Sequence, residues 1–234
     1  MSENKGDGFK ISPSYSPKMI ERHMKESDDM AMNEMRETME RMEKTASAIK
    51  ANTNKIMNNS LNTELANKKQ ARDHAFDLYQ KMAKQIDRVN NRVQAEIDKD
   101  NEQTEKPFKE AATKSQFAKE IRDHLRTLNS DERKEFLNDA FQSGDFEAIG
   151  AVLGAPNYLS GLKPAERDYY KKMAEQQFFG NTKDRVSRLD KAREDMVSAA
   201  MWMSNDISRN FDSQELRQAE QTASEAEAAR QADI

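Results

Sequence analysis

No cysteine occurs in the sequence, which excludes disulfide bridges, thiol catalysis and thiolate metal sites. Long apolar runs are also missing. None approaches the roughly 18 residues that a membrane-spanning helix needs, and the first residues lack the apolar core of a signal peptide. The formal net charge of -4 excludes a general basic field that would hold nucleic acid or an anionic membrane. We therefore expect a soluble, cytosolic product without a membrane partner.

Glycine and proline are scarce, with 7 and 5 in 234 residues, and none of them lies between residues 18 and 106. Seven of these twelve residues gather between Gly144 and Gly180. Hydrophobic residues make up only 35% of the chain and charged residues 34%, which is too little apolar material for one large globular core. Amphipathic helices need only one apolar stripe each, so the composition predicts an all-α protein.

These breaks, together with the scarcity of large apolar residues after residue 211, divide the chain into five segments. A proline at residue 107 marks the end of the long segment without breaks, because proline disrupts a helix interior. The expected segments are a flexible leader (1–17), a long helical coiled-coil arm (18–106), a compact helical module (107–180), an amphipathic helix (181–211) and a polar tail, helical or disordered (212–234).

Two seams of apolar side chains run along the arm, one over residues 35–56 and the other over residues 75–93. Their alternating steps of three and four residues are typical of a coiled coil. The spacing between the seams is not a multiple of seven, and residues 58–63 are poor helix formers that favour turns. The arm is therefore either one continuous rod or a hairpin that folds back at this join.

An isolated pair of such helices leaves apolar surface uncovered, so we expect the arm to associate with copies of itself or to dock on a partner. Eight of the fourteen methionines lie in the first 42 residues, and flexible methionines suit either a helix seam or a surface that meets several partners. The candidate self-association seam consists of Met35, Met39, Met42, Ile49, Ile56, Tyr79, Met82, Ile86, Val89 and Val93.

A basic block covers residues 44–72, where six basic residues stand against one acidic residue. Such a block serves as a solvated face, as a pairing face for an acidic stretch, or as a nucleic-acid contact. It lacks the interleaved aromatic residues and the groove-reading motifs of nucleic-acid-binding proteins. If it does bind nucleic acid, the candidate contacts are Lys44, Lys50, Lys55, Lys68, Lys69 and Arg72.

The cluster of glycines and prolines surrounds a short apolar island. Asn129 with Glu132 has the spacing of a capping box at the start of a helix, and Gly144 is placed to end that helix with positive φ. Asp145 is placed to cap the next helix and Pro164 to begin another. We therefore expect tight corners between short helices around a small core. Four residues are candidates for docking on a partner, although each also fits a buried role: Tyr158, Leu159, Leu162 and the single tryptophan, Trp202.

No motif in the sequence indicates a chemistry. The three histidines are far apart, and the phosphate-binding, dinucleotide-binding, zinc-protease and serine-hydrolase signatures are all missing. Pairs of acidic residues lie in strongly charged stretches, where burial cannot tune them for acid–base catalysis. We therefore expect a protein that is not an enzyme, with no catalytic residue, cofactor or metal.

The stretch A-P-N-Y-L-S-G-L (residues 155–162), followed by a charged helix that begins at a proline, resembles a pattern in small helical proteins of tailed bacteriophages and prophages. The likeness extends over about residues 130–179 and brings no catalytic residues. It implies a virion or morphogenesis protein, present in the host cytoplasm and in the virion, that oligomerises and docks on a portal, capsid or tail component. The alternatives are a nucleic-acid-associated or regulatory binding protein and a small inhibitor of a host or defence protein.

Overall fold

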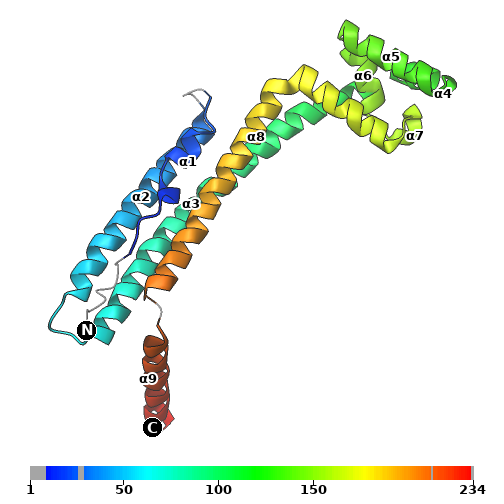
Figure 1. Ribbon diagram of the computed structural model, residues 1–234. Coiled ribbons are helices and arrows are strands. Elements are labelled where there is room, and N and C mark those ends of the chain that lie inside the picture. Colours follow the sequence, from blue (N-terminus) through cyan, green and yellow to red (C-terminus); the bar gives the residue numbers. More distant parts are fainter. Residues whose placement is uncertain (1–8, 26–28, 212, 233–234) are drawn as a thin grey trace. The chain divides into compact units, whose positions relative to one another are not determined.

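The computed structural model describes residues 9–25, 29–211 and 213–232, and this part of the chain contains helices and turns without any strand (Figure 1). The all-α prediction is therefore confirmed. The elements are η1 (Pro13–Tyr15), α1 (Lys18–Glu21), α2 (Met30–Met57), α3 (Glu64–Lys114), α4 (Ala118–Thr127), α5 (Ser130–Ser143), α6 (Phe146–Leu153), α7 (Asn157–Ser160), α8 (Pro164–Phe211) and α9 (Gln214–Ala232).

The chain divides into two compact units. Unit 1 combines residues 1–93 with residues 191–234, and unit 2 consists of residues 94–190. The long helices α3 and α8 each contribute one part to each unit. The segments expected from the sequence have other boundaries, because local signals do not show that the part of α8 from residue 191 to residue 211 belongs with the first helices of the chain.

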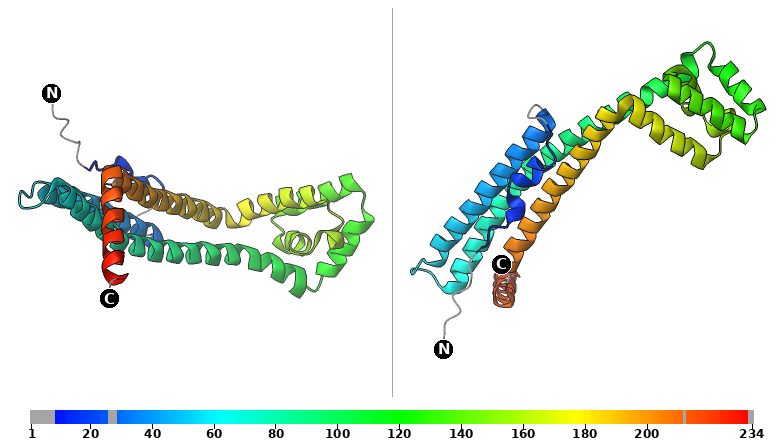
Figure 2. Two further views of the ribbon diagram at one scale, coloured as in Figure 1. Left: turned by 90° about the horizontal axis from the view of Figure 1, so that it is seen from below. Right: turned by 45° about the horizontal axis from the view of Figure 1, so that its top comes forward.

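In unit 1, α2 and α3 form an antiparallel hairpin (Figures 1 and 2). Three contacts fix their register: Glu34 with Arg92 at 2.6 Å, Thr45 Oγ1 with Met82 Sδ at 3.9 Å, and Asn52 with His74 at 3.0 Å. From one pair to the next, the residue number in α2 increases while the residue number in α3 decreases by almost the same amount, as an antiparallel register requires. The hairpin is therefore the correct alternative, and the continuous rod is wrong.

The last part of α8 (residues 191–211) lies beside this hairpin, and Arg193 Nη1 donates to Asn90 Oδ1 of α3 at 3.2 Å. Its side chains Met196, Met203 and Ile207 are buried. Eight residues of the candidate self-association seam are buried as well, namely Met35, Met39, Met42, Ile49, Met82, Ile86, Val89 and Val93, while Ile56 and Tyr79 are half-buried. The expectation that these seams leave apolar surface for another molecule is corrected, because the chain covers them itself.

Residues 9–25, which we call the N-terminal strap, run antiparallel to α8 in unit 1. The ring of Phe9 stacks on Phe211 with centroids 6.4 Å apart, and Tyr15 donates its hydroxyl hydrogen to Asp206. Farther along, Arg22 pairs with Asp195 at 2.7 Å. The expectation of a flexible leader is therefore wrong for residues 9–17, and residues 1–8 of that leader lie outside the described part of the chain. The strap is held because its aromatic residues are buried.

Helix α3 continues through Pro107 and ends only at Lys114, so the prediction that the helix ends at this proline is wrong. Proline removes one backbone donor and disfavours the helix interior. The residue after it, Phe108, is buried in the core of unit 2, where its ring lies 5.2 Å from that of Phe146 and 5.7 Å from that of Phe179. Burial of this large aromatic side chain outweighs the loss of one helical hydrogen bond.

The short helices of unit 2 have the caps that the sequence predicts. Asn129 and Glu132 form a capping box at the start of α5, and Gly144 ends that helix with a φ of 69°. The Asp145 side chain accepts a hydrogen bond from the backbone N–H of Ala148 at 2.9 Å and so caps α6. A kink at Phe179 divides α8 close to the position where a new helix was expected.

Gly150 in α6 and Gly154 directly after it have a role other than turning the chain. A Cβ atom added at Gly150 would lie 2.5 Å from the Cβ of Ala111, and one added at Gly154 would lie 1.9 Å from the backbone oxygen of Phe108. Both distances are too short for any side chain, so the two glycines let α6 approach the backbone of α3 closely. Part of the glycine cluster thus serves a helix crossing rather than a corner.

Candidate functional site

The four candidate docking residues have different environments. Tyr158 is 77% exposed on α7, whereas Leu162 is only 6% exposed and belongs to the core of unit 2. Leu159 is half-buried. In unit 1, Trp202 is 45% exposed on α8. Leu162 is therefore corrected from a docking residue to a core residue, while Tyr158 and Trp202 remain available on the surface.

Sequence reasoning did not single out Met201, which is 62% exposed and precedes Trp202 on α8. The buried side chains Met196 and Met203 define the inner face of that helix, so residues 201 and 202 point away from the core. The sequence contained one signal of this exposure, because residues 201 and 202 lie between the apolar residues Ala200 and Met203, which are spaced to face the core. In unit 2, Phe117 and Tyr169 are also exposed without having been predicted.

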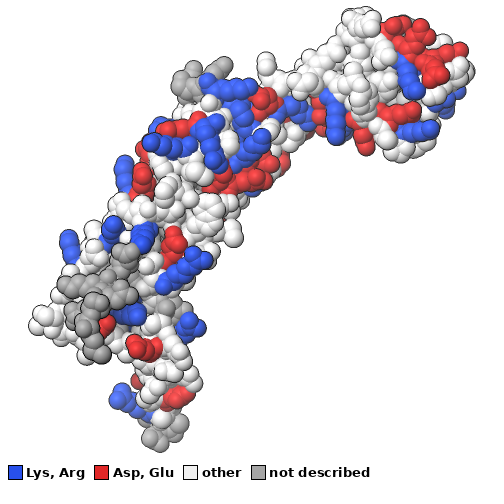
Figure 3. Space-filling model, in the orientation of Figure 1, with Lys and Arg blue, Asp and Glu red and all other residues white. Residues whose placement is uncertain are grey.

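The candidate nucleic-acid contacts do not form one free basic surface. Lys44, Lys50 and Lys55 are exposed on α2, and Lys68 is half-buried on α3. The space-filling view shows basic and acidic side chains interspersed over the visible face (Figure 3). The remaining two contacts, on α3, are paired with a carboxylate from the end of the chain.

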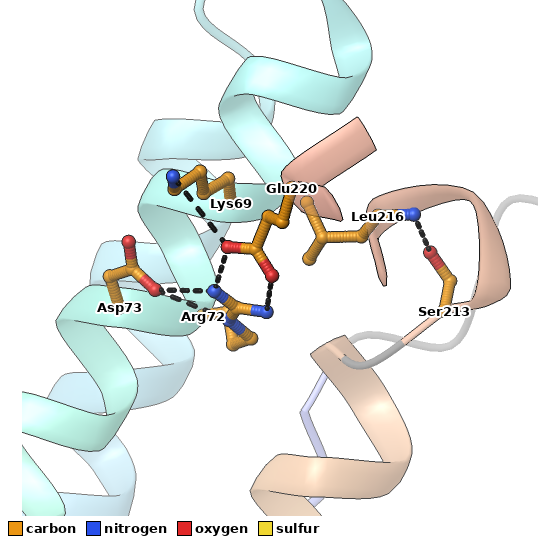
Figure 4. A network of polar contacts seen from close by, with 6 residues as sticks. All are labelled: Lys69, Arg72, Asp73, Ser213, Leu216 and Glu220. Carbon is orange, nitrogen blue, oxygen red and sulfur yellow. Dashed lines mark hydrogen bonds and ion pairs between the residues drawn. The ribbon is translucent and has the colours of Figure 1, made fainter. Parts of the chain in front are cut away.

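That carboxylate belongs to Glu220 of α9 (Figure 4). Arg72 binds it with two hydrogen bonds, Nη1 to Oε2 at 2.9 Å and Nη2 to Oε1 at 2.6 Å, and the ammonium group of Lys69 lies 3.6 Å from Oε1. Asp73 holds the other side of the guanidinium at 2.9 Å. We call this cluster of Lys69, Arg72, Asp73 and Glu220 the α9 latch.

The electrostatics of the latch favour the charged carboxylate. The hydrogen bond from Arg72 is the main cause that lowers the pKa of Glu220 below its ordinary value, and the charges of Arg72 and Lys69 add to it. Two of the six candidate nucleic-acid contacts are thereby neutralised inside the chain. The sequence contained no signal for this pairing, because Glu220 lies in a polar segment 148 positions after Arg72.

A shallow, open pocket of about 570 Å³ lies between α2 and α3, next to the latch. Ile56, Ala66, Lys69, Gln70, Asp73 and His74 line it. Its charged members Lys69 and Asp73 are exposed to water and engaged in the latch. Such a site offers neither a buried acid or base nor an activated nucleophile.

Three arginines of unit 2 bind carbonyl oxygens at helix ends. Arg122 donates to Ala112 O at 3.0 Å and to Ala151 O at 2.9 Å, and Arg167 donates to Leu153 O at 2.7 Å. Arg133 donates to Leu128 O at 2.9 Å and to Gly161 O at 2.6 Å. These side chains satisfy carbonyl groups that a helix leaves unpaired at its end, so their role is structural.

Among the described residues, no group of three or more histidine, aspartate or glutamate side chains is placed to hold a metal ion. Within the same ranges, none of the helices combines the length and the apolar character required to cross a membrane.

Comparison with known proteins adds no family to these observations. A scan against protein-family models found no match, and searches of curated proteins and of solved structures found none either. The function must therefore be inferred from the exposed aromatic side chains and from the contacts between segments of this chain.

Proposed function

We propose that this chain is a non-enzymatic structural or assembly protein that docks on a larger protein assembly and associates with copies of itself. The motif over residues 155–162 extends the proposal to a virion or morphogenesis component of a tailed bacteriophage, with a portal, capsid or tail protein as the partner. The observation that carries the proposal is the exposed aromatic ring of Tyr158, held on a short, fixed element.

The position of Tyr158 supports a docking role. Pro156 precedes α7, Gly161 ends it with a φ of 71°, and Leu162 anchors the following backbone in the core. The ring therefore projects from a rigid support, and little conformational freedom is lost when a partner buries it. Exposed aromatic side chains of this kind are the usual anchors of protein interfaces.

The exposed pair Met201 and Trp202 supports self-association through unit 1. The seams of this unit are closed inside one chain, so copies would meet through a different surface. A tryptophan and a methionine next to each other on a helix bury a large apolar area when they are covered.

The self-association is tested by light scattering coupled to size-exclusion chromatography over a range of protein concentrations. The expected result is a mass above that of one chain at high concentration, lowered to the mass of one chain in the variant Trp202→Ser. A matched control is Leu61→Ser, which removes another exposed apolar side chain, in the turn between α2 and α3. A wild-type protein that remains a single chain at every concentration would contradict the self-association.

The docking role is tested with a photo-crosslinking amino acid in place of Tyr158, in cells that produce the protein naturally. We expect one dominant crosslinked product that contains a protein of a large assembly. The control is the same amino acid in place of Lys163, an exposed residue just before α8. Identical products at both positions, or none at position 158, would contradict the docking role.

A further inference from the structure

The contact of α9 with the rest of unit 1 is limited to its first turns. Leu216 is buried at 1% exposure, and its backbone N–H donates to Ser213 Oγ at 3.3 Å. One turn later, Glu220 enters the latch. From Gln221 to Gln231, every side chain is exposed. Among the contacts described for this helix, the burial of Leu216 and the ion pair of Glu220 are therefore the main attachments.

The receiving surface on α3 recognises the carboxylate of Glu220. Leu216 and Glu220 are four residues apart, so they lie on the same face of α9. The guanidinium of Arg72 has only 17% of its side chain exposed and binds the carboxylate in a bidentate manner, which is a geometrically selective contact. The surface therefore fits a helix that presents a glutamate on the same face as its buried leucine.

The attachment is small, and opening it leaves the core of unit 1 intact. One buried leucine and one ion pair near the solvent contribute little compared with the buried seams of α2, α3 and α8. Each copy of the chain carries both the helix and its receiving surface. A second copy therefore offers a site with the same complementary charges.

We propose that α9 of one copy docks on Lys69 and Arg72 of a second copy, so that two chains exchange their C-terminal helices. This inference rests on the proposed self-association and adds a second contact between the copies to the one through Met201 and Trp202. The exchanged pair reproduces each contact of the single chain, and its two interfaces are identical, as in a symmetric dimer. Dilution favours docking within one chain, whereas a high local concentration in an assembly favours exchange.

A pair of charge reversals tests the exchange. In Arg72→Glu and in Glu220→Arg, docking within one chain is broken because like charges meet in the latch. When the two variants are mixed, exchange restores both opposite-charge pairs. With one variant labelled with heavy isotopes, native mass spectrometry distinguishes mixed pairs from pairs of like chains. We expect mixed pairs in roughly fivefold excess over the statistical proportion, as two restored ion pairs provide.

Two controls accompany the mixture. The double variant R72E/E220R restores the latch within one chain and should show no preference for mixed pairs with either single variant. The variant Glu227→Arg, mixed with Arg72→Glu, changes a charge on α9 outside the latch and should leave the proportion statistical. Circular dichroism establishes that each variant retains the helix content of the wild type.

The outcomes separate the exchange from the proposed function. Mixed pairs at the statistical proportion, or no pairs at all, overturn the exchange. If the wild type nevertheless forms oligomers that Trp202→Ser removes, the proposed self-association stands without exchange. An excess of mixed pairs that Glu227→Arg reproduces also overturns the exchange, because the preference then comes from general charge and not from the latch.

Discussion

Individual glycines of unit 2 have two distinct roles. Gly144 and Gly161 adopt positive φ values of 69° and 71°, which end α5 and α7. Gly150 and Gly154 instead lie where α6 meets α3, at distances that exclude a Cβ atom. The first role is readable from the position of a glycine after a helix, and the second depends on which helix lies opposite.

Replacing Gly154 with alanine should destabilise unit 2 by at least about 2 kcal/mol, because the added Cβ would overlap the backbone oxygen of Phe108 and force the two helices apart. Urea unfolding followed by circular dichroism measures the change. Gly180→Ala is the matched control, since its Cβ would meet only the flexible end of Gln176 at 3.2 Å. Equal stability of the two variants would contradict the close helix crossing.

The buried tyrosine of the strap provides a pH-dependent contribution to unit 1. Burial, together with the hydrogen bond to Asp206, raises the pKa of Tyr15 above its ordinary value of 10.0. The folded state therefore favours the neutral phenol, and this stabilisation is complete below pH 10 and decreases as the pH rises above 10.

We expect Tyr15→Phe to lose about 1–3 kcal/mol of stability at pH 7, because Asp206 loses its hydrogen-bond donor. The variant should also lose part of the alkaline destabilisation. Thermal unfolding between pH 7 and pH 11 measures both effects. If the wild type and the variant decline in parallel above pH 10, another group causes the alkaline loss.

At the scale of the elements, helix formation and helix packing follow different rules. The three-four spacing of apolar residues predicted the helical seams that α2 and α3 contain, and the turn formers at residues 58–63 separate them. Pro107 shows the limit of local rules, because packing of the following residues keeps α3 helical. The N-terminal strap shows the same limit for a segment that contains two prolines.

The strap depends on its aromatic anchor. Phe9→Ala should cost about 3 kcal/mol through lost burial and the lost stacking on Phe211. Hydrogen–deuterium exchange should increase in the strap and near the end of α8. In the control Ile11→Ala, an exposed strap residue is shortened and exchange should hardly change. Unchanged protection in Phe9→Ala would show that the strap is not held by this ring.

Acidic pH should release α9. The lowered pKa of Glu220 means that the latch favours the carboxylate, so its contribution is complete above the ordinary value of 4.5 and is lost as the pH falls through the lowered value. Spin labels on α9 and on α3 measure the distance between the helices during an acid titration. In Glu220→Gln, the separation should already be present at pH 7 and should lack this transition. A wild-type distance that remains constant under acid would contradict the role of the carboxylate.

At the scale of the whole molecule, each unit has its own core. The core of unit 2 includes Phe108, Leu137 and Ile149, and that of unit 1 includes Met39 and Met203. Separate cores allow local stability to differ between the units, although α3 and α8 run through both.

A core substitution should therefore weaken mainly its own unit. Leu137→Ala should destabilise unit 2 by about 2–5 kcal/mol, with faster hydrogen–deuterium exchange in α4 to α7 and little change in α2. Met39→Ala should show the reverse pattern. Equal acceleration throughout the described residues, in either variant, would indicate one cooperative unit.

The sequence by itself determined the features that depend on neighbouring residues. Apolar periodicity indicated the all-α class and the seams, and short-range capping signals such as Asn129 with Glu132 placed helix ends in unit 2. Local pattern also singled out Tyr158 and Trp202, but it left open whether each is buried or exposed. These features depend on backbone conformation and on side chains within one or two helical turns, so the local sequence is enough to predict them.

Only the tertiary structure decided which segments meet. It covers the seams of α2 and α3 with the end of α8, brings Phe108 against Phe146, and places Glu220 on Arg72. An apolar stripe or a lone charge has the same local signal whichever partner it finds. Which segments pack together depends on shape and charge complementarity between residues far apart in the chain. The periodicity of a single segment does not indicate which other segment it contacts.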